Sequence, residues 1–163
     1  MCLKKEVDFS LLLPTRNRPD SLIRLIDSIS KTSSGEKSIE ILIYTDKDDG
    51  LTLDRKDDIV NAVDKQKPIN IIFLNDDSGK SWYNNWWEFL WNNSSGKYGM
   101  LCGDDLIFQT YEWDMKINNF TFLLSCVSNQ VFPIPYSFLD ISIDPRRWFL
   151  LFTCLISILS SDI

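Results

Sequence analysis

Residues 7–29, VDFSLLLPTRNRPDSLIRLIDSI, carry the pattern of a strand, a loop and a helix in direct succession. The apolar run Val7–Leu13 ends at a proline and is typical of a buried strand. Pro19 and Asp20 form a helix-start signal, and apolar residues then recur at helical spacing until Ser33–Gly35. This unit predicts a strand that leads into a helix through a short basic loop.

The same alternation continues along the chain to about residue 108. The predicted elements that follow are a strand Ile39–Tyr44, a helix Leu53–Gln66, a strand Ile69–Leu74, a helix Ser81–Trp91, and short strands Tyr98–Cys102 and Leu106–Phe108. Buried strands that alternate with helices predict an α/β fold, with a mainly parallel sheet flanked by helices. Ligands of such folds bind at the carboxyl ends of the strands, so the loops after the strands are the candidate sites.

Composition excludes several classes of chemistry. The 163 residues carry a net charge of −6, which disfavours a nucleic-acid partner because phosphate contacts need a basic surface. The chain contains no histidine, which excludes the Ser-His-Asp triad, the Cys-His dyad and histidine-ligated zinc. Acid–base or metal chemistry must therefore come from the 23 aspartate and glutamate residues.

Charge divides the chain near residue 117. Residues 1–116 hold 35 charged residues and residues 117–163 only five, so we predict an α/β domain over 1–116 and an apolar tail over 117–163. In the tail, Trp148–Ser161 is shorter than the ~20 residues of a membrane-spanning helix, and Phe120–Leu139 contains two prolines. We expect buried or loosely packed segments there rather than membrane contact. The cysteine spacing fits neither a zinc site nor a disulfide framework, and no signal peptide is recognisable, which favours a cytoplasmic protein.

Two adjacent aspartates, Asp104 and Asp105, lie in the otherwise apolar stretch MLCGDDLIF, residues 100–108. Carboxylates in apolar surroundings are costly unless a cation or hydrogen-bond donors meet them. Hard oxygen ligands of this type suit Mg²⁺ or Mn²⁺, which retain waters and bridge substrate phosphates. We interpret Asp104 and Asp105 as metal ligands, with a purely structural turn as the alternative.

The loop PTRNRP, residues 14–19, is the second candidate site. Its backbone and its two arginines could hold an anionic nucleotide. The alternative is that both arginines are only solvent-exposed, while Asn17 helps to cap the following helix.

Four strings of sequence, taken together, resemble the nucleotide-binding half of family-2-type glycosyltransferases, whose fold is called GT-A. They are SLLLPTRNRPDSL, ILIYTDKDD, GKSWYNNWW and MLCGDDLIFQTYEWD, and the resemblance covers residues 7–116. The order of their features matches the family: a basic loop after the first strand, an acidic residue after the second and a DxD-like turn after the fourth. The resemblance implies a GT-A-like, Rossmann-like domain that binds a nucleotide-diphosphate sugar.

By position, the resemblance also assigns roles to individual residues. Asp46 would accept hydrogen bonds from the base or ribose, and Asp104 and Asp105 would stand at Mn²⁺ or Mg²⁺ and the diphosphate. Trp113 and Asp114 resemble the segment that often follows the DxD-like turn. The residues expected to flank the nucleotide base and ribose are Pro14, Thr15, Arg16 and Arg18.

The chain also departs from the family's pattern. Gly103 occupies the first acidic position of a strict DxD turn, and the residues after Lys116 do not match an acceptor-binding half. No motif identifies a general base, so Asp140 and Asp144 are the only candidates offered. We therefore expect a glycosyltransferase-like protein that binds donor and transfers sugar to an unknown acceptor slowly or not at all.

Two alternative functions remain open. One is a catalytically inactive nucleotide-sugar-binding remnant or partner module. The other is a sugar nucleotidyltransferase, which ranks third because the glycine-rich, lysine-containing loop of such enzymes is absent after the first strand.

Overall fold

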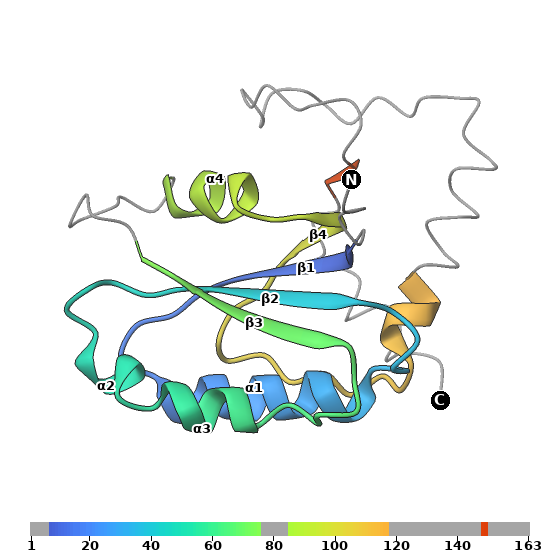
Figure 1. Ribbon diagram of the computed structural model, residues 1–163, viewed down its shortest axis with the longest axis horizontal. Coiled ribbons are helices and arrows are strands. Elements are labelled where there is room, and N and C mark those ends of the chain that lie inside the picture. The colour runs from blue at the N-terminus through green and yellow to red at the C-terminus, as the bar shows by residue number, and fades with distance from the viewer. Residues whose placement is uncertain (1–6, 76–84, 118–147, 150–163) are drawn as a thin grey trace, which may run out of the picture.

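The computed structural model describes residues 7–75, 85–117 and 148–149 (Figure 1). The elements are β1 (Val7–Pro14), α1 (Pro19–Thr32), β2 (Ile39–Tyr44), α2 (Gly50–Leu53), α3 (Lys56–Asn61), β3 (Ile69–Leu74), α4 (Asn85–Asn92), β4 (Gly96–Leu101) and β5 (Trp148–Phe149). Residues 113–117 are also helical. The strands form one sheet in the order β3-β2-β1-β4-β5, and each neighbouring pair is parallel. This confirms the predicted α/β fold with a parallel sheet.

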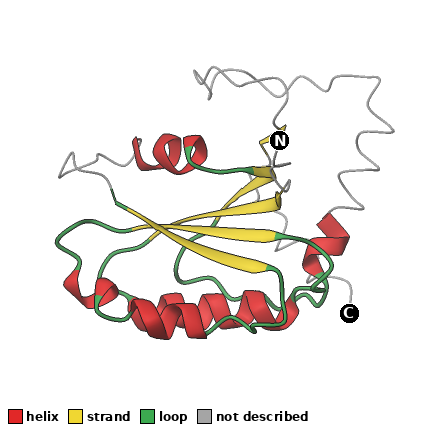
Figure 2. Ribbon diagram, in the orientation of Figure 1, coloured by secondary structure: helices red, strands yellow, loops and turns green. Residues whose placement is uncertain are grey.

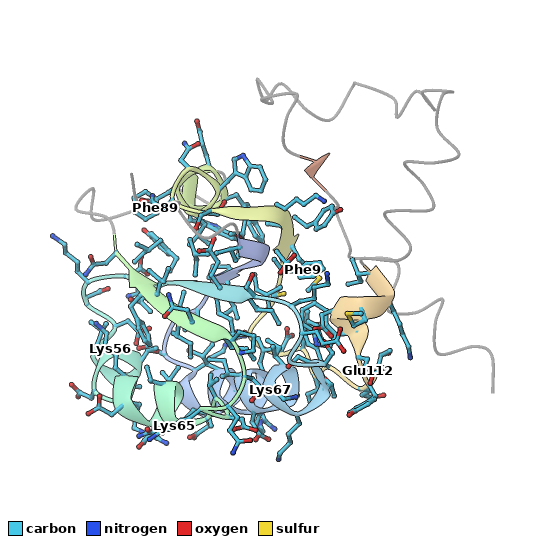
Figure 3. All side chains as sticks on the ribbon, turned by 45° about the vertical axis from the view of Figure 1, so that its right-hand side comes forward. Phe9, Lys56, Lys65, Lys67, Phe89 and Glu112 are labelled. Atoms are coloured by element: carbon cyan, nitrogen blue, oxygen red, sulfur yellow. The ribbon has the colours of Figure 1, made fainter. Side chains whose placement is uncertain are left out.

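Helices cover both faces of the sheet, with α1 and α3 on one face and α4 on the other (Figure 2). Successive residues of a strand point to opposite faces, so Leu11 packs into the core beneath α1 while Leu12 packs with Leu90 of α4. Figure 3 shows the same division, because Phe89 and Lys67 lie on opposite sides of the sheet. Burial on both faces explains why β1 and β2 have nearly continuous apolar sequences.

Helix α1 confirms the strand–loop–helix unit that the sequence predicts. Pro19 is its first residue, where a missing backbone N–H costs nothing, and Asp20 stands in its first turn. The apolar residues at helical spacing are all fully buried against the sheet: Leu22, Leu25, Ile26 and Ile29.

The predicted helix over 53–66 is wrong in extent. The structure forms two short helices instead, α2 and α3, which are joined by a turn at Asp54 and Arg55. Beyond α3, Asp64 makes a local turn, accepting hydrogen bonds from the N–H of Gln66 at 3.0 Å and of Lys67 at 2.9 Å. Aspartate favours such turns because its short side chain satisfies the backbone two residues on.

The predicted strand Leu106–Phe108 is also wrong, because these residues are irregular. The N–H of Phe108 donates to the Ser28 hydroxyl at 3.0 Å, so this segment bonds to α1 rather than to a strand. The Phe108 ring packs against Trp113, with the ring centroids 4.9 Å apart. After β4, the chain therefore turns back and contacts α1.

Some predictions fall on residues outside the described ranges. The start of the helix expected from Ser81 is one of them, and most of the predicted tail is another. The tail contributes strand β5 to the sheet, and in it Trp148 pairs with Tyr98 and Phe149 with Gly99 of β4. Within the ranges that are described, no helix has the length and apolar character needed to cross a bilayer.

A buried carboxylate, Glu40 of β2, fixes the start of β4. Glu40 is 3% exposed and accepts hydrogen bonds from the Ser10 hydroxyl at 2.5 Å, the Ser95 N–H at 2.5 Å, the Ser95 hydroxyl at 2.7 Å and the Gly96 N–H at 3.2 Å. A Cβ at position 96 would lie 2.3 Å from the Ser10 hydroxyl oxygen, so this close approach requires glycine. Because β4 leads directly to Asp104, Glu40 also helps to place the candidate site.

We predict that Glu40→Ala lowers the free energy of unfolding by about 3 kcal/mol, because buried donors lose a charged acceptor. Urea unfolding monitored by circular dichroism measures the effect. The control is Glu36→Ala, at an exposed position, for which a change within about 0.5 kcal/mol is expected. Equal effects of the two substitutions would contradict the structural role of Glu40.

Candidate functional site at the carboxyl edge of the sheet

The loops that follow β1, β2 and β4 begin side by side at the carboxyl edge of the sheet. The Thr15 N–H donates to the Tyr44 carbonyl at 3.0 Å, and the Cys102 N–H donates to the Leu12 carbonyl at 2.9 Å. These bonds continue the parallel ladders one residue past the strands. The base of each loop is therefore held by the sheet, as sites on α/β folds require.

Asp104 joins the β1–α1 loop to the turn after β4. Its carboxylate Oδ2 accepts a hydrogen bond from the Thr15 hydroxyl at 2.8 Å, and Oδ1 accepts from Arg18 Nη1 at 3.1 Å. Asp104 is only 7% exposed, so these donors supply the partners that a buried carboxylate needs. The structure thus brings together three of the predicted site residues, Thr15, Arg18 and Asp104.

Asp105 stands in a different environment from its neighbour. It is exposed, and its Oδ1 lies over Gly103, where an added Cβ would come within 2.7 Å of that oxygen. The glycine at the first position of the DxD-like turn therefore leaves room for the Asp105 side chain. Of the two aspartates, Asp104 is bound to protein groups and Asp105 faces solvent.

Arg16 bridges the β1–α1 loop and the β2–α2 loop. Its Nη1 donates to Asp46, and its Nη2 donates to Asp48 at 2.9 Å. Both hydrogen bonds raise the pKa of the Arg16 guanidinium above its usual range, and the bond to Asp48 has the larger effect. The predicted nucleotide-binding residues Arg16 and Asp46 are thus adjacent, and they are paired with each other.

The Asp49 side chain connects the same two loops. Its Oδ2 accepts a hydrogen bond from the Asn17 N–H at 3.0 Å, and its Oδ1 accepts from the Thr52 N–H at 3.0 Å at the start of α2. Asn17 has a φ of 56°, a left-handed conformation that asparagine tolerates better than most residues. The side chain of Asn17 makes no cap for α1, whose N-cap is Arg18 without a side-chain hydrogen bond.

Pro14 and Cys102 also lie near this edge of the sheet. Pro14 ends β1 opposite Tyr44. Cys102, which precedes the turn, is a free, buried thiol whose pKa is raised to about 12 by burial, so it is not a nucleophile at neutral pH. Asp140 and Asp144, the candidate general bases, lie outside the described residues.

The residues Trp113 and Asp114 lie at the other end of the sheet. Asp114 is fully buried and accepts hydrogen bonds from the Ser34 N–H at 2.9 Å and the Ser34 hydroxyl at 2.6 Å. Trp113 packs against Phe9 of β1. Figure 3 shows that Phe9 lies on the side of the sheet nearer to the segment that carries Glu112. Trp113 and Asp114 therefore contact the start of β1 and the segment after α1, away from the carboxyl edge of the sheet.

A surface cavity of about 470 Å³ also lies away from the candidate site. Its lining comes from the end of α1 and from the segment before β3, and it includes Asp27, Lys31, Asp64 and Lys67. The carboxyl edge contributes none of its lining residues. We therefore base the site on the convergence of loops rather than on this cavity.

Sequence reasoning did not identify Asp48, Asp49 or Glu40 as contributors. The acidic run after β2 was the available signal for Asp48 and Asp49. No local pattern distinguishes Glu40, because its partners Ser95 and Gly96 are more than 50 residues away.

No protein-family model matches the chain, and no curated protein matches its sequence. Solved structures do match, among them S. aureus TarS, with a TM-score of 0.56 and 15% identity over 72% of this chain and 20% of that chain. TarS 1–349 in complex with UDP matches at 15% identity, and the complex with UDP-GlcNAc at 16%, each with a TM-score of 0.56 over 72% of this chain and 32% of that chain. The chain thus spans about a fifth of the first structure and about a third of the other two.

At this level of identity the comparison establishes the fold alone. The chain has an α/β, GT-A-like fold, which confirms the predicted fold class.

The different environments of the two aspartates predict different effects on stability. Asp104→Ala leaves the Thr15 hydroxyl and Arg18 without their acceptor, and we expect the free energy of unfolding to fall by about 1–3 kcal/mol. Asp105→Ala, one residue away at an exposed position, should change it by less than about 0.5 kcal/mol. Urea titrations of both variants measure this difference, and similar losses would show that Asp104 does not hold the two loops together.

Proposed function

We propose that the carboxyl edge of the sheet binds a nucleotide-diphosphate sugar as the donor for glycosyl transfer. The observation that supports this most directly is the convergence of Thr15, Arg16, Arg18, Asp46 and Asp104 from three loops in a glycosyltransferase-like fold. TarS, which shares that fold, has been crystallised with UDP and with UDP-GlcNAc.

The charges at this edge suit the two ends of such a ligand. Asp46 is a partly exposed carboxylate that could accept hydrogen bonds from a base or ribose, which present N–H and O–H donors. Arg16 and Arg18 offer planar guanidinium groups, which recognise phosphate oxygens with two parallel hydrogen bonds. In this proposal, the nucleoside lies toward the β2–α2 loop, and the diphosphate extends from Arg16 toward Arg18 and the turn after β4.

A divalent cation fits the proposal through Asp105. Within residues 7–75, 85–117 and 148–149, no three acidic or cysteine side chains are grouped so that they alone could hold a metal ion. Mg²⁺ commonly uses one or two carboxylates together with substrate phosphates, and Asp105 offers an exposed carboxylate for that arrangement. When bound, Mn²⁺ or Mg²⁺ would neutralise the charge that develops on the leaving diphosphate.

Transfer to an acceptor additionally needs a group that takes a proton from the acceptor hydroxyl. Asp140 and Asp144 are the residues proposed for that role. A donor-consumption assay with a panel of sugar acceptors separates a transferase from a module that only binds donor, since only the transferase forms a new glycoside.

We predict that UDP binds more tightly with Mn²⁺ than with EDTA, and that Asp105→Asn removes most of this difference because it removes the charged ligand. Isothermal titration calorimetry measures both affinities. Affinities for the wild-type chain that are identical with and without metal would refute the metal assignment.

We also predict that Asp46→Ala weakens UDP binding by about tenfold, which corresponds to the loss of one hydrogen bond to a charged group. Asp57→Ala on the exposed face of α3 removes the same charge and should have little effect. If both substitutions act equally, the nucleotide binds somewhere other than at this edge.

A further inference from the structure

Both terminal nitrogens of Arg16 donate to carboxylates in this structure. Nη1 donates to Asp46 and Nη2 donates to Asp48, and both acceptors belong to the β2–α2 loop. A guanidinium that binds a diphosphate uses these same nitrogens. Arg16 keeps other N–H donors, but a nucleotide that binds it through both Nη1 and Nη2 competes with the two carboxylates for them.

We propose that Asp48 restrains Arg16 in the nucleotide-free protein and competes with the donor diphosphate for its guanidinium. The inference rests on the proposed function and adds to it a residue that opposes binding. Asp48 is a positioning residue, because it acts through Arg16 and has no expected contact with the ligand.

Exposure shows which of the two carboxylates gives way. The Asp48 side chain is 73% exposed and that of Arg16 is 50% exposed, whereas Asp46 is 32% exposed. An ion pair between exposed side chains is weak and is screened by salt. Of the two ion pairs of Arg16, the pair with Asp48 is therefore the more exposed and the easier to break.

Local charge points in the same direction. The β2–α2 loop contributes Asp46, Asp48 and Asp49, and Asp49 is already engaged by the Asn17 and Thr52 N–H groups. Around Arg16, the remaining carboxylates outnumber the single guanidinium. Removing the charge of Asp48 weakens its hold on Nη2 and reduces the repulsion that a diphosphate meets, so the affinity should rise.

The two carboxylates that bind Arg16 thus have opposite expected effects. Asp46→Ala removes a proposed nucleotide contact and weakens binding, whereas Asp48→Asn removes a competitor and strengthens it. A merely structural role of Asp48 would give the same sign as Asp46, namely a loss.

The test is calorimetric titration of the full chain with UDP and Mn²⁺ at low salt. We expect Asp48→Asn to bind UDP about two- to fivefold more tightly than the wild type, the range that an exposed ion pair can supply. The matched control is Asp58→Asn, which makes the same charge change and also removes an exposed partner of an arginine, Arg55. It should leave the affinity unchanged.

A double-mutant cycle with Arg16→Ala measures the coupling between Asp48 and Arg16 in UDP binding. In that background Asp48→Asn should no longer tighten binding, because the guanidinium for which it competes is gone. An equal gain with and without Arg16 would overturn the proposal in favour of a general charge effect.

A second readout does not depend on nucleotide. Phenylglyoxal modifies accessible arginines, and peptide mass spectrometry follows its reaction with Arg16. The reaction should be faster in Asp48→Asn than in the wild type or in Asp58→Asn.

The outcomes separate the inference from the proposed function. If the wild type binds UDP while Asp48→Asn shows neither tighter binding nor faster modification, only the inference is overturned. If UDP binds to none of the variants, the proposed function fails and the competition fails with it.

Discussion

A buried negative charge must be met by donors, and this constraint connects the described parts of the chain. Among the residues that the structure describes, four acidic side chains are nearly or fully buried: Glu40, Asp49, Asp104 and Asp114. Each accepts hydrogen bonds from a segment distant in sequence, as when Asp104 binds Thr15 and Asp114 binds Ser34. Because an unmet carboxylate would cost several kcal/mol, these contacts specify which segments lie together as well as stabilising them.

Two of these carboxylates act near the two ends of β1. Glu40 binds Ser10 and the start of β4, while Asp104 binds Thr15 beyond the end of β1. The loop that carries Arg16 and Arg18 is itself held by Asp104 and by Asp49, which accepts from the Asn17 N–H, before any ligand arrives. Loops that are held in this way need less ordering when they bind, which favours affinity.

The sequence was sufficient to predict β1 to β4 and the first helix, because their apolar runs and helix-start signals are local. It was not sufficient for the segment after β4, where contacts of Phe108 with Ser28 and Trp113 override its strand-like composition. The long helix predicted from Leu53 is interrupted by a turn at Asp54 and Arg55, so its apolar periodicity overstated its length.

For the candidate site, motif positions predicted the correct edge of the sheet but not how its charges pair. Adjacent aspartates look equivalent in sequence, yet burial gives Asp104 protein partners and leaves Asp105 in solvent. Likewise, nothing local to Arg16 shows that both of its terminal nitrogens are already bonded by carboxylates some 30 residues away. Such pairings depend on the register between strands, which only the folded chain specifies.

The pairing of β1 with β4 has a consequence for synthesis of the protein. β1 leaves the ribosome well before β4, and the register Val7 with Gly96 means that one of its two edges gains its partner only after β4 has been made. Until then, an apolar strand can pair with β2 alone, and its other edge stays open to wrong partners. Parallel sheets with such long sequence separations fold slowly, so the nascent chain must pass through a vulnerable period that chaperones are suited to cover.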